Sequence, residues 1–413
     1  MNMGLNEMLF PNLAGIEKAV FYLHDGTYNE RSILGIGIEK QLKIQHAVPN
    51  TFELLNVFLN QEKWKIGYIG YDAKNAVEKL KSPILDPQEK PCLYFVIPEI
   101  ILSIEKGQIT VLQGKNNGEL NQIIDSISTK YQEGEAEEIE LTPRINKHQY
   151  LHAIEQVQKH IQQGDIYELN FCQEFYANEA KIDPFDVYFK LHKITKAPFS
   201  TFLKWSEHSL MCASPERFLS QNGNALLSQP IKGTIRRGKN AEEDKKLVEQ
   251  LKNDPKERSE NIMITDLVRN DLSKSAEKGS VEVTELCEIY SFETVHQMIS
   301  TVVAKKKAGV TNGQVIKNLF PMGSMTGAPK VRAMQLIDQL ESTSRGLYSG
   351  AVGYVDPEGN FDFNVVIRSL MYNEQKKYLS ALVGGAITAA SIPEKEYEEC
   401  LLKAEALFQS LMS

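Results

Sequence analysis

The chain has 413 residues, of which 42% are hydrophobic and 24% are charged, and its formal net charge is −8 at pH 7. This length and composition suit a soluble globular protein with two or three ordinary domains or one large α+β unit. The acidic balance argues against a nucleic-acid partner, and an acidic protein that binds an anion must gather its Lys and Arg locally or recruit a metal ion.

The cysteines and apolar runs predict a reducing compartment and no membrane partner. Five cysteines are scattered along the chain without a CxxC pair: Cys92, Cys172, Cys212, Cys287 and Cys400. This pattern is typical of reduced thiols rather than of a disulfide framework or a zinc site. The opening MNMGLNEMLFPN lacks a basic segment followed by an apolar one, and no apolar run is long enough to span a bilayer. We therefore expect a cytoplasmic protein.

Residues 1–140 predict short strands and hairpins, because apolar runs such as ILGIGI and WKIGYIGYD alternate with Gly, Asn and Pro. The acidic stretch EGEAEEIE marks a seam near residue 140, and from residue 145 helices alternate with apolar strands. The motifs that carry chemistry lie beyond residue 213. We therefore expect an N-terminal supporting part (residues 1–140) and a catalytic part (residues 145–413).

Lys232 lies in the segment SQPIKGTIRRG, in a predicted turn. A lysine in such a turn is ordinarily exposed and inert. The alternative is that the nearby cations Arg236, Arg237 and Lys239, together with partial burial, lower the pKa of Lys232 and free its amine as a nucleophile.

Two further residues are candidate partners of this amine. Glu216, in the stretch ASPERFL, is sixteen residues upstream and is a candidate acid–base group. His296, in ETVHQMIS, is a candidate orienting donor, although a lone histidine is more often structural.

Two predicted helices carry glutamates three residues apart, and such residues share a helix face. KERSENIMITDLVRNDL contains Glu257 and Glu260, and SIPEKEYEECLLKAEALFQSLM contains Glu396 and Glu399. Each pair alone is typical of a solvated face, whereas two pairs that meet suit a Mg²⁺ ion. The apolar stripe of the second helix is predicted to be Tyr397, Leu401, Ala404, Phe408 and Leu411.

The stretch FPMGSMTGAPKVRAMQLIDQLE predicts a glycine-rich loop that leads into a helix. Its spacing does not match the nucleotide-binding P-loop, so an anion cradle and a plain turn remain as alternatives. Farther along, Arg368 lies in the apolar run NVVIRSL, which predicts a strand. An arginine there pairs either with a carboxylate of the protein or with an anionic ligand.

The motifs of the second part resemble, in their order, those of the chorismate-utilising enzymes: SPERF, PIKGT, ERSENIMITDLVRNDL, VHQMIS, MGSMTGAPKVRAMQLI, YSGAVGY, NVVIRSL and VGGAIT. The resemblance covers about residues 145–410, and GYIGYD at 67–72 is similar to the N-terminal part of the aminating members. It implies an α+β fold, a large two-sub-domain β-sandwich of antiparallel sheets with outer helices.

Within this family the resemblance favours amination of chorismate at carbon 4. Aminodeoxychorismate synthases carry PIKGT, as here, whereas anthranilate synthases carry PIAGT. Isochorismate-forming members have a water-activating lysine where this chain has Glu168 in GDIYELNF. The aminating members more usually have glutamine there, so the role of Glu168 stays open.

The resemblance also implies roles for individual residues. Lys232 would add to the ring carbon next to the carboxylate-bearing carbon, while Glu216 protonates the departing 4-hydroxyl. Mg²⁺ would be held by Glu260 and Glu399, with Glu257 and Glu396 beside it or acting through water. The residues expected around the substrate are His296, Gly233, Thr234, Ser324, Tyr348, Arg368, Gly384 and Gly385.

Ammonia is expected from a separate glutamine amidotransferase subunit. The cysteine nucleophile of such enzymes lies in a tight glycine-flanked turn, and none of the five cysteines here has a glycine neighbour. Two alternatives remain open: an anthranilate synthase component I, and a non-catalytic homologue that only binds chorismate or an aromatic compound.

Overall fold

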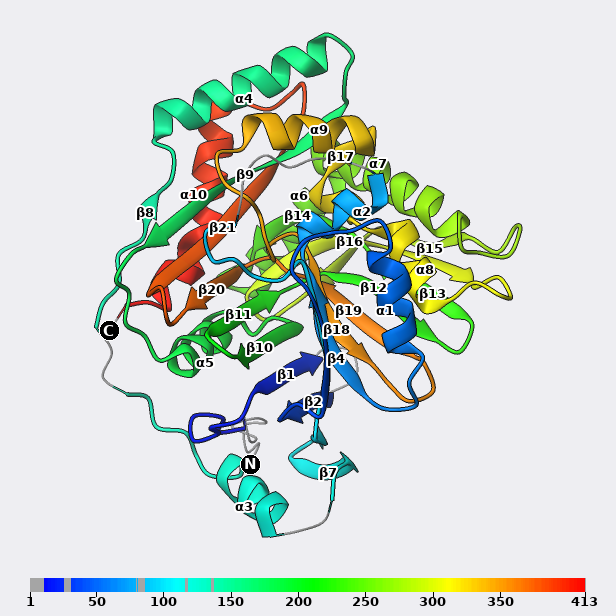
Figure 1. Ribbon diagram of the computed structural model, residues 1–413. Coiled ribbons are helices and arrows are strands. Elements are labelled where there is room, and N and C mark those ends of the chain that lie inside the picture. Colours follow the sequence, from blue (N-terminus) through cyan, green and yellow to red (C-terminus); the bar gives the residue numbers. More distant parts are fainter. Residues whose placement is uncertain are drawn as a thin grey trace.

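Two large antiparallel sheets face each other in the computed structural model, which describes residues 11–25, 31–78, 80, 86–115, 118–134 and 137–412. Helices cover the outer sides of the sheets (Figure 1). Each sheet buries one face against the other and its second face beneath helices.

The first sheet has eleven strands among the described residues, in the order β17-β9-β21-β20-β11-β10-β1-β2-β6-β7, with β8 paired to β9. Its strands are β1 (Val20–Asp25), β2 (Arg31–Ile36), β6 (Ile100–Glu105), β7 (Gln108–Gln113), β8 (Thr142–Pro143), β9 (Glu168–Ala177), β10 (Phe199–Trp205), β11 (His208–Ser214), β17 (Gly327–Ala328), β20 (Ser369–Asn373) and β21 (Tyr378–Ile387).

The second sheet has ten strands over the same described ranges, in the order β14-β16-β13-β12-β19-β18-β4-β5-β3, with β15 paired to β16. Its strands are β3 (Lys40–Ile44), β4 (Lys65–Ile69), β5 (Leu93–Ile97), β12 (Arg217–Asn222), β13 (Ala225–Gln229), β14 (Ile231–Arg236), β15 (Glu282–Ser291), β16 (Val295–Lys305), β18 (Ala351–Val355) and β19 (Phe361–Val365).

The helices lie outside the sandwich. They are α1 (Thr51–Leu59), α2 (Lys74–Glu78), α3 (Gly118–Ile127), α4 (Lys147–Gln162), α5 (Pro184–Thr195), α6 (Ala241–Asn253), α7 (Pro255–Ser273), α8 (Asn312–Leu319), α9 (Lys330–Leu340) and α10 (Pro393–Gln409), with short 3₁₀ turns η1 (Tyr71–Ala73) and η2 (Gly323–Met325). In Figure 1, α4, α9 and α10 lie along β9 and β21, and α7 packs on β14, β15 and β16.

Alternation along the strands of the first sheet divides the apolar side chains between two cores. In β1, Phe21 and Leu23 point into the core between the sheets, whereas Val20 and Tyr22 point into the core beneath the outer helices. Side chains two residues apart share a face of a strand, so a strand buried on both faces reads as a continuous apolar run. This explains why the strands were recognisable from the sequence.

The predicted α+β sandwich of antiparallel sheets is confirmed. Each sheet combines strands from both sides of the seam near residue 140, since β1 pairs with β10 and β4 pairs with β18. The expected division of labour between residues 1–140 and 145–413 stays a prediction.

The apolar stripe predicted for α10 is partly wrong. Leu401 is 36% exposed, whereas the buried residues of this helix are Glu396, Cys400, Ala404 and Leu407. The buried stripe is rotated toward the glutamate that the sequence analysis had assigned to a metal site. The rotation has a functional consequence, because it turns one carboxylate of the pair inward.

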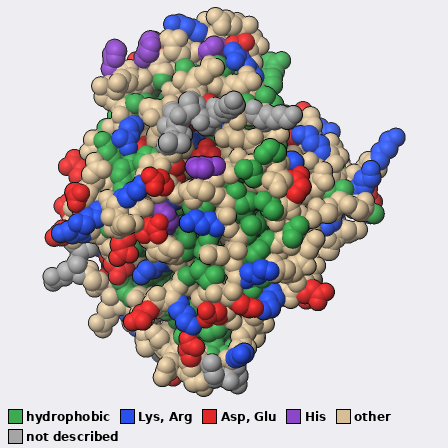
Figure 2. Space-filling model, viewed as in Figure 1, with side chains coloured by type: hydrophobic (Ala, Val, Ile, Leu, Met, Phe, Trp, Pro, Cys, Tyr) green, Lys and Arg blue, Asp and Glu red, His purple; other side chains and the backbone are tan. Residues whose placement is uncertain are grey.

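The surface has no exceptional feature on the face that Figure 2 shows. Lys, Arg, Asp and Glu side chains are interspersed there, with small apolar areas between them (Figure 2). Within the described part of the chain, no helix is both long and apolar enough to cross a membrane. All five cysteines are free thiols and are buried.

Candidate active site

Lys232 lies in a bulged edge strand rather than in the predicted turn. Strand β14 is at the end of the second sheet, and its pairing with β16 shifts register between Ile231 and Thr234. Gly233 has φ +90°, a conformation that L-residues rarely adopt. A bulge redirects the side chains next to it, so this irregularity sets the direction of the lysine.

The amine of Lys232 points into a buried group of carboxylates. Its Nζ lies 2.8 Å from Oε1 of Glu168 on β9, and the two side chains are 10% and 0% exposed. Burial by itself would lower the pKa of Lys232, but the carboxylates of Glu168 and Glu260 outweigh it and raise this pKa above its ordinary value.

The expected lowering of this pKa by neighbouring cations is therefore wrong. Arg236 pairs with Glu243 at 2.6 Å, and Arg237 pairs with Asp244 at 2.9 Å. Both arginines are thus neutralised at helix α6, and the lysine faces acids on the other side of its strand. In this structure Lys232 is an ammonium ion held by a carboxylate.

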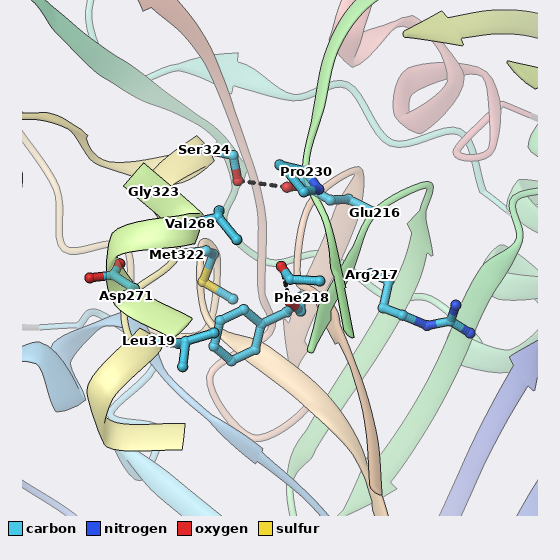
Figure 3. Close-up of a pocket in the computed structure, with 11 residues that line it drawn as sticks. Glu216, Arg217, Phe218, Pro230, Val268, Asp271, Leu319, Met322, Gly323 and Ser324 are labelled. Atoms are coloured by element: carbon cyan, nitrogen blue, oxygen red, sulfur yellow. Dashed lines mark hydrogen bonds between the residues drawn. The ribbon is translucent and has the colours of Figure 1, made fainter. Parts of the chain in front are cut away.

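Glu216 occupies a buried position suited to an acid. It directly precedes β12, and its Oε1 accepts a 2.6 Å hydrogen bond from Oγ of Ser324 in η2 (Figure 3). Burial raises the pKa of Glu216 to about 7, although the hydrogen bond from Ser324 and the charge of Lys232 act to lower it. A carboxyl group with this pKa can carry a proton at neutral pH.

A small pocket lies beside this pair and opens between η2 and α7. Glu216, Ser324, Gly323 and Val268 contribute to its lining. Asp271 also borders the pocket, but its carboxylate points away from Glu216 (Figure 3) and pairs with Lys330.

Lys330 is the lysine of the glycine-rich loop, and it ties that loop to α7. Its Nζ donates to the carbonyl oxygens of Leu319 and Pro321 at 3.2 and 2.7 Å, as well as to Asp271. The loop is therefore a braced turn that presents Ser324 to Glu216.

The four predicted metal-binding glutamates belong to α7 and α10. Lys256, in the first turn of α7, lies between glutamates of the two helices. Nζ of Lys256 lies 3.8 Å from Oε1 of Glu260 and 3.5 Å from Oε1 of Glu396. Glu399 pairs with Lys403 at 2.6 Å. Glu257, in the first turn of α7, points its carboxylate toward β14. Its Oε2 lies 3.1 Å from where a Cβ on Gly233 would be.

These carboxylates have the donor chemistry of a Mg²⁺ site. Burial raises the pKa of Glu260 to about 7 and also raises that of Glu257. Oε1 of Glu260 and Oε2 of Glu396 are buried without a hydrogen-bond partner, a deficit that a cation would satisfy. Over the described ranges, no three acidic, histidine or cysteine side chains are close enough to hold an ion as they stand. Metal binding would therefore require these side chains to move together.

Arg368 does not lie within a strand, contrary to the prediction. It follows β19 and precedes β20, where the chain passes from the second sheet to the first, and its φ is +51°. Burial lowers its pKa, and it forms no ion pair with a carboxylate of the described residues. Its Nη1 donates to the carbonyl oxygen of Lys403 at 3.1 Å. A partly buried guanidinium without a carboxylate partner suits a ligand carboxylate, and the buried side chain of Tyr348 lies close to it.

The Gly384–Gly385 pair lies in β21, directly beside β9. A Cβ on Gly384 would come within 2.5 Å of Sγ of Cys172, so the packing there requires glycine. A Cβ on Gly385 would face Oε2 of Glu396 and Nζ of Lys403 at 3.6 and 3.8 Å. Gly385 therefore borders the acidic cluster, whereas Gly384 is packed against the neighbouring strand.

Thr234 and His296 lie farther along the β14–β16 pair. Thr234 is exposed and pairs with Gln297. The ring of His296 is fully buried, with Nδ1 2.8 Å from Oγ of Ser291 and Nε2 2.9 Å from Oδ1 of Asp244. Because both ring nitrogens have protein partners, His296 joins β16 to β15 and α6 in this structure rather than offering a free donor.

Two residues that the sequence analysis did not assign organise the site. Glu168 is the direct partner of Lys232. Arg345 is buried and donates to the carbonyl oxygens of Asn170 and Met325 at 2.7 and 2.6 Å, while it pairs with Glu341 at 2.6 Å. It thereby joins β9 to η2. In the sequence, Arg345 could be noticed only as an arginine four residues after Glu341, and such pairs are common on exposed helices.

Comparison with known proteins connects this geometry to one family. A family model described as chorismate binding enzyme matches residues 19–409. The chain is 42% identical over 273 residues to the chloroplastic aminodeoxychorismate synthase of Arabidopsis thaliana, a match that covers 65% of this chain and 30% of that protein. The chain thus spans less than a third of the length of that relative.

Two further proteins are similar over most of their length. Aminodeoxychorismate synthase component 1 of Escherichia coli (strain K12) is 32% identical over 355 residues, which is 84% of this chain and 76% of that protein. The crystal structure of anthranilate synthase component I from Streptococcus pneumoniae TIGR4 has a TM-score of 0.81 at 26% identity and covers 92% of each chain.

Proposed function

The chain belongs to the chorismate binding enzymes, and from this premise we propose that it converts chorismate and ammonia into 4-amino-4-deoxychorismate. The observation that carries the proposal is the position of Lys232, an amine buried among carboxylates and directed inward from a bulged strand. Relatives named aminodeoxychorismate synthase support the same choice of reaction.

In the proposed reaction the amine of Lys232 attacks the ring carbon adjacent to the carboxylate-bearing carbon. The double bonds shift, and the 4-hydroxyl leaves as water with the proton of Glu216. Ammonia then adds at carbon 4, the double bonds shift back, and the lysine is released. Two carboxyl groups that act on the amine have different environments, since Glu216 accepts from a hydroxyl and Glu168 pairs with an ammonium ion.

Substrate anions would be bound at two places. The unpaired guanidinium of Arg368, beside Tyr348, suits the enolpyruvyl carboxylate. The ring carboxylate would bind at the acidic cluster through Mg²⁺ held by Glu260 and Glu399, with Glu257 and Glu396 nearby, and the ion would supply positive charge for this anion. Gly385 on β21 borders this cluster.

Ammonia would come from a separate glutamine amidotransferase subunit in the cytoplasm. The Escherichia coli relative is named component 1, which supports a partner component. The five cysteines of this chain are all buried, which does not suit the exposed nucleophile of a glutaminase.

Anthranilate synthesis is the second candidate, because a solved structure of similar fold over 92% of both chains is an anthranilate synthase component. Incubation of the purified protein with chorismate, Mg²⁺ and an ammonium salt separates the two. Release of fluorescent anthranilate without any added enzyme would contradict the proposal. We expect a product that yields 4-aminobenzoate only after a pyruvate-removing lyase is added.

A further inference from the structure

We propose that Glu168 is the base that takes the proton from Lys232 and holds it while the lysine is bonded to the substrate. This inference rests on the proposed amination through Lys232. It assigns a role to a side chain whose function the sequence left open.

The need for such a base follows from the charge of the lysine. An ammonium ion has no lone pair, so it must lose a proton before it can attack a ring carbon. Lys232 is only 10% exposed, and its ordinary pKa is raised by the surrounding carboxylates. A buried amine with little contact with water has to transfer its proton to a group of the protein.

Glu168 is placed to accept this proton. Its Oε1 is 2.8 Å from Nζ of Lys232, which is within proton-transfer distance. The side chain is 0% exposed, and its Oε2 is buried without a hydrogen-bond partner. One of the two carboxylate oxygens of Glu168 is therefore left without a hydrogen bond. A purely structural ion pair would ordinarily have these oxygens satisfied.

The other carboxylates around the amine are the proposed acid and the proposed metal ligands. Glu216 receives a hydrogen bond from Ser324 and is the proposed acid. The charged groups that face the lysine from other elements are Glu216 before β12, Glu257 and Glu260 on α7, and Glu399 on α10. Only Glu168 forms a hydrogen bond with Nζ of Lys232 among the described residues.

The proton count closes over a full cycle. Lys232 gives one proton to Glu168, and the neutral amine attacks while Glu216 protonates the leaving hydroxyl as water. The adduct is a secondary ammonium ion. When ammonia adds at carbon 4, the lysine leaves as a neutral amine and recovers its proton from Glu168. The new ammonium group on the product gives its proton to Glu216, so both carboxyl groups return to their starting states.

The test is the rate of adduct formation without ammonia, followed by rapid quenching and intact-protein mass measurement at saturating Mg²⁺. The adduct adds the mass of chorismate less one water. In the wild-type protein the internal transfer makes this rate independent of pH over about pH 5 to 6, where Glu216 stays protonated. In Glu168→Gln the amide can still accept the hydrogen bond but cannot hold the proton. We expect a rate about 10²- to 10⁴-fold lower that rises tenfold per pH unit over the same range.

Two other variants separate this role from a structural one. Glu168→Asp keeps a carboxylate and should restore a pH-independent rate, even if the rate is reduced. Glu174→Gln removes a buried carboxylate of another ion pair on the same strand, 2.8 Å from Arg144, and should leave the rate independent of pH.

A Glu168→Gln protein that forms the adduct with the wild-type pH dependence would overturn the inference and leave the amination standing. A wild-type protein that makes no adduct on Lys232 while releasing product would overturn both. The two failures are therefore distinguishable within one set of measurements.

Discussion

At the scale of single residues, the chemistry of this site depends on which charges surround one amine. The sequence identified Lys232 and Glu216 by their type and motif, but the sequence neighbours suggested cations around the lysine. The fold instead places Glu168 2.8 Å from it and brings Glu260 close enough to act on its charge. Lys232 is therefore an ammonium ion before substrate binds, and its proposed reactivity depends on Glu168 as an internal proton acceptor.

Lys232→Ala tests the nucleophile directly. We expect amination to fall by at least about 10³-fold, because the amine bonded to Glu168 is the proposed nucleophile, while chorismate binding is retained. Product formation with added lyase measures the first quantity, and calorimetric titration with chorismate measures the second. Lys239→Ala, which changes an exposed lysine on the same segment, is the control and should be near wild type. Near-normal turnover in Lys232→Ala would exclude the covalent route.

Ser324→Ala tests Glu216 as the acid. The acid is active in its protonated form, so the rate is highest below the pKa of Glu216, about 7, and falls as the pH rises through that value. The hydroxyl of Ser324 stabilises the carboxylate, so its removal should shift the falling limb to higher pH by roughly one unit. The readout is kcat/KM against pH.

Ser344→Ala is the matched control for this shift, since that hydroxyl bonds to Asp72 at 3.0 Å, outside the site. Its pH profile should coincide with that of the wild-type protein. A Ser324→Ala profile that also coincides would show that another group carries the proton.

At the scale of elements, two helix starts set the directions of the four glutamates. Asp254 caps α7 through hydrogen bonds from the backbone of Lys256 and Glu257, and Pro255 occupies the first turn. Pro393 occupies the same place in α10. These starts fix the rotational phase of each helix, and because the helices converge, Glu260 and Glu396 both turn inward toward Lys256.

Glu399→Gln tests the proposed metal site on α10. Loss of a carboxylate from a Mg²⁺ site should raise the half-saturating Mg²⁺ concentration at least about tenfold, since the amide is a weaker ligand. Mg²⁺ titrations of activity and of heat release both measure this. Glu398→Gln, the exposed neighbour on the same helix, should not change the titration. An unchanged Mg²⁺ requirement in Glu399→Gln would remove this glutamate from the site.

At the scale of the whole molecule, the positions of the proposed catalytic residues depend on strands from the first 140 residues. Strand β1 lies between β10 and β2, and β4 lies between β18 and β5. Arg368 occupies the crossing from one sheet to the other, so its position is set by how the two sheets pack. Neither half of the chain contains a complete sheet.

This arrangement predicts that residues 141–413 do not fold alone. Without residues 1–140, this segment would expose the backbone edges of β10 and β18 and one side of the core between the sheets. We expect the isolated segment to lack a cooperative thermal unfolding transition by circular dichroism. Co-expression of both segments should restore the transition, as complementary parts of one sandwich. A cooperatively folded, chorismate-binding 141–413 segment would contradict this view.

The sequence by itself determined the kinds of element and the chemistry that they carry. Apolar runs and turn residues predicted the strands, and the motifs around Lys232, Glu216 and the paired glutamates indicated the family. These features are local, because they depend on residue type, spacing and the preferences of a few neighbouring residues.

Only the tertiary structure decided the charge state of Lys232, the partner of His296, the break in the strand at Arg368 and the buried face of α10. Each of these depends on residues that are distant in sequence, such as Glu168 and Lys232, which lie on different sheets. Electrostatic and packing effects act through space, so no local pattern around position 232 could indicate a carboxylate 64 residues away.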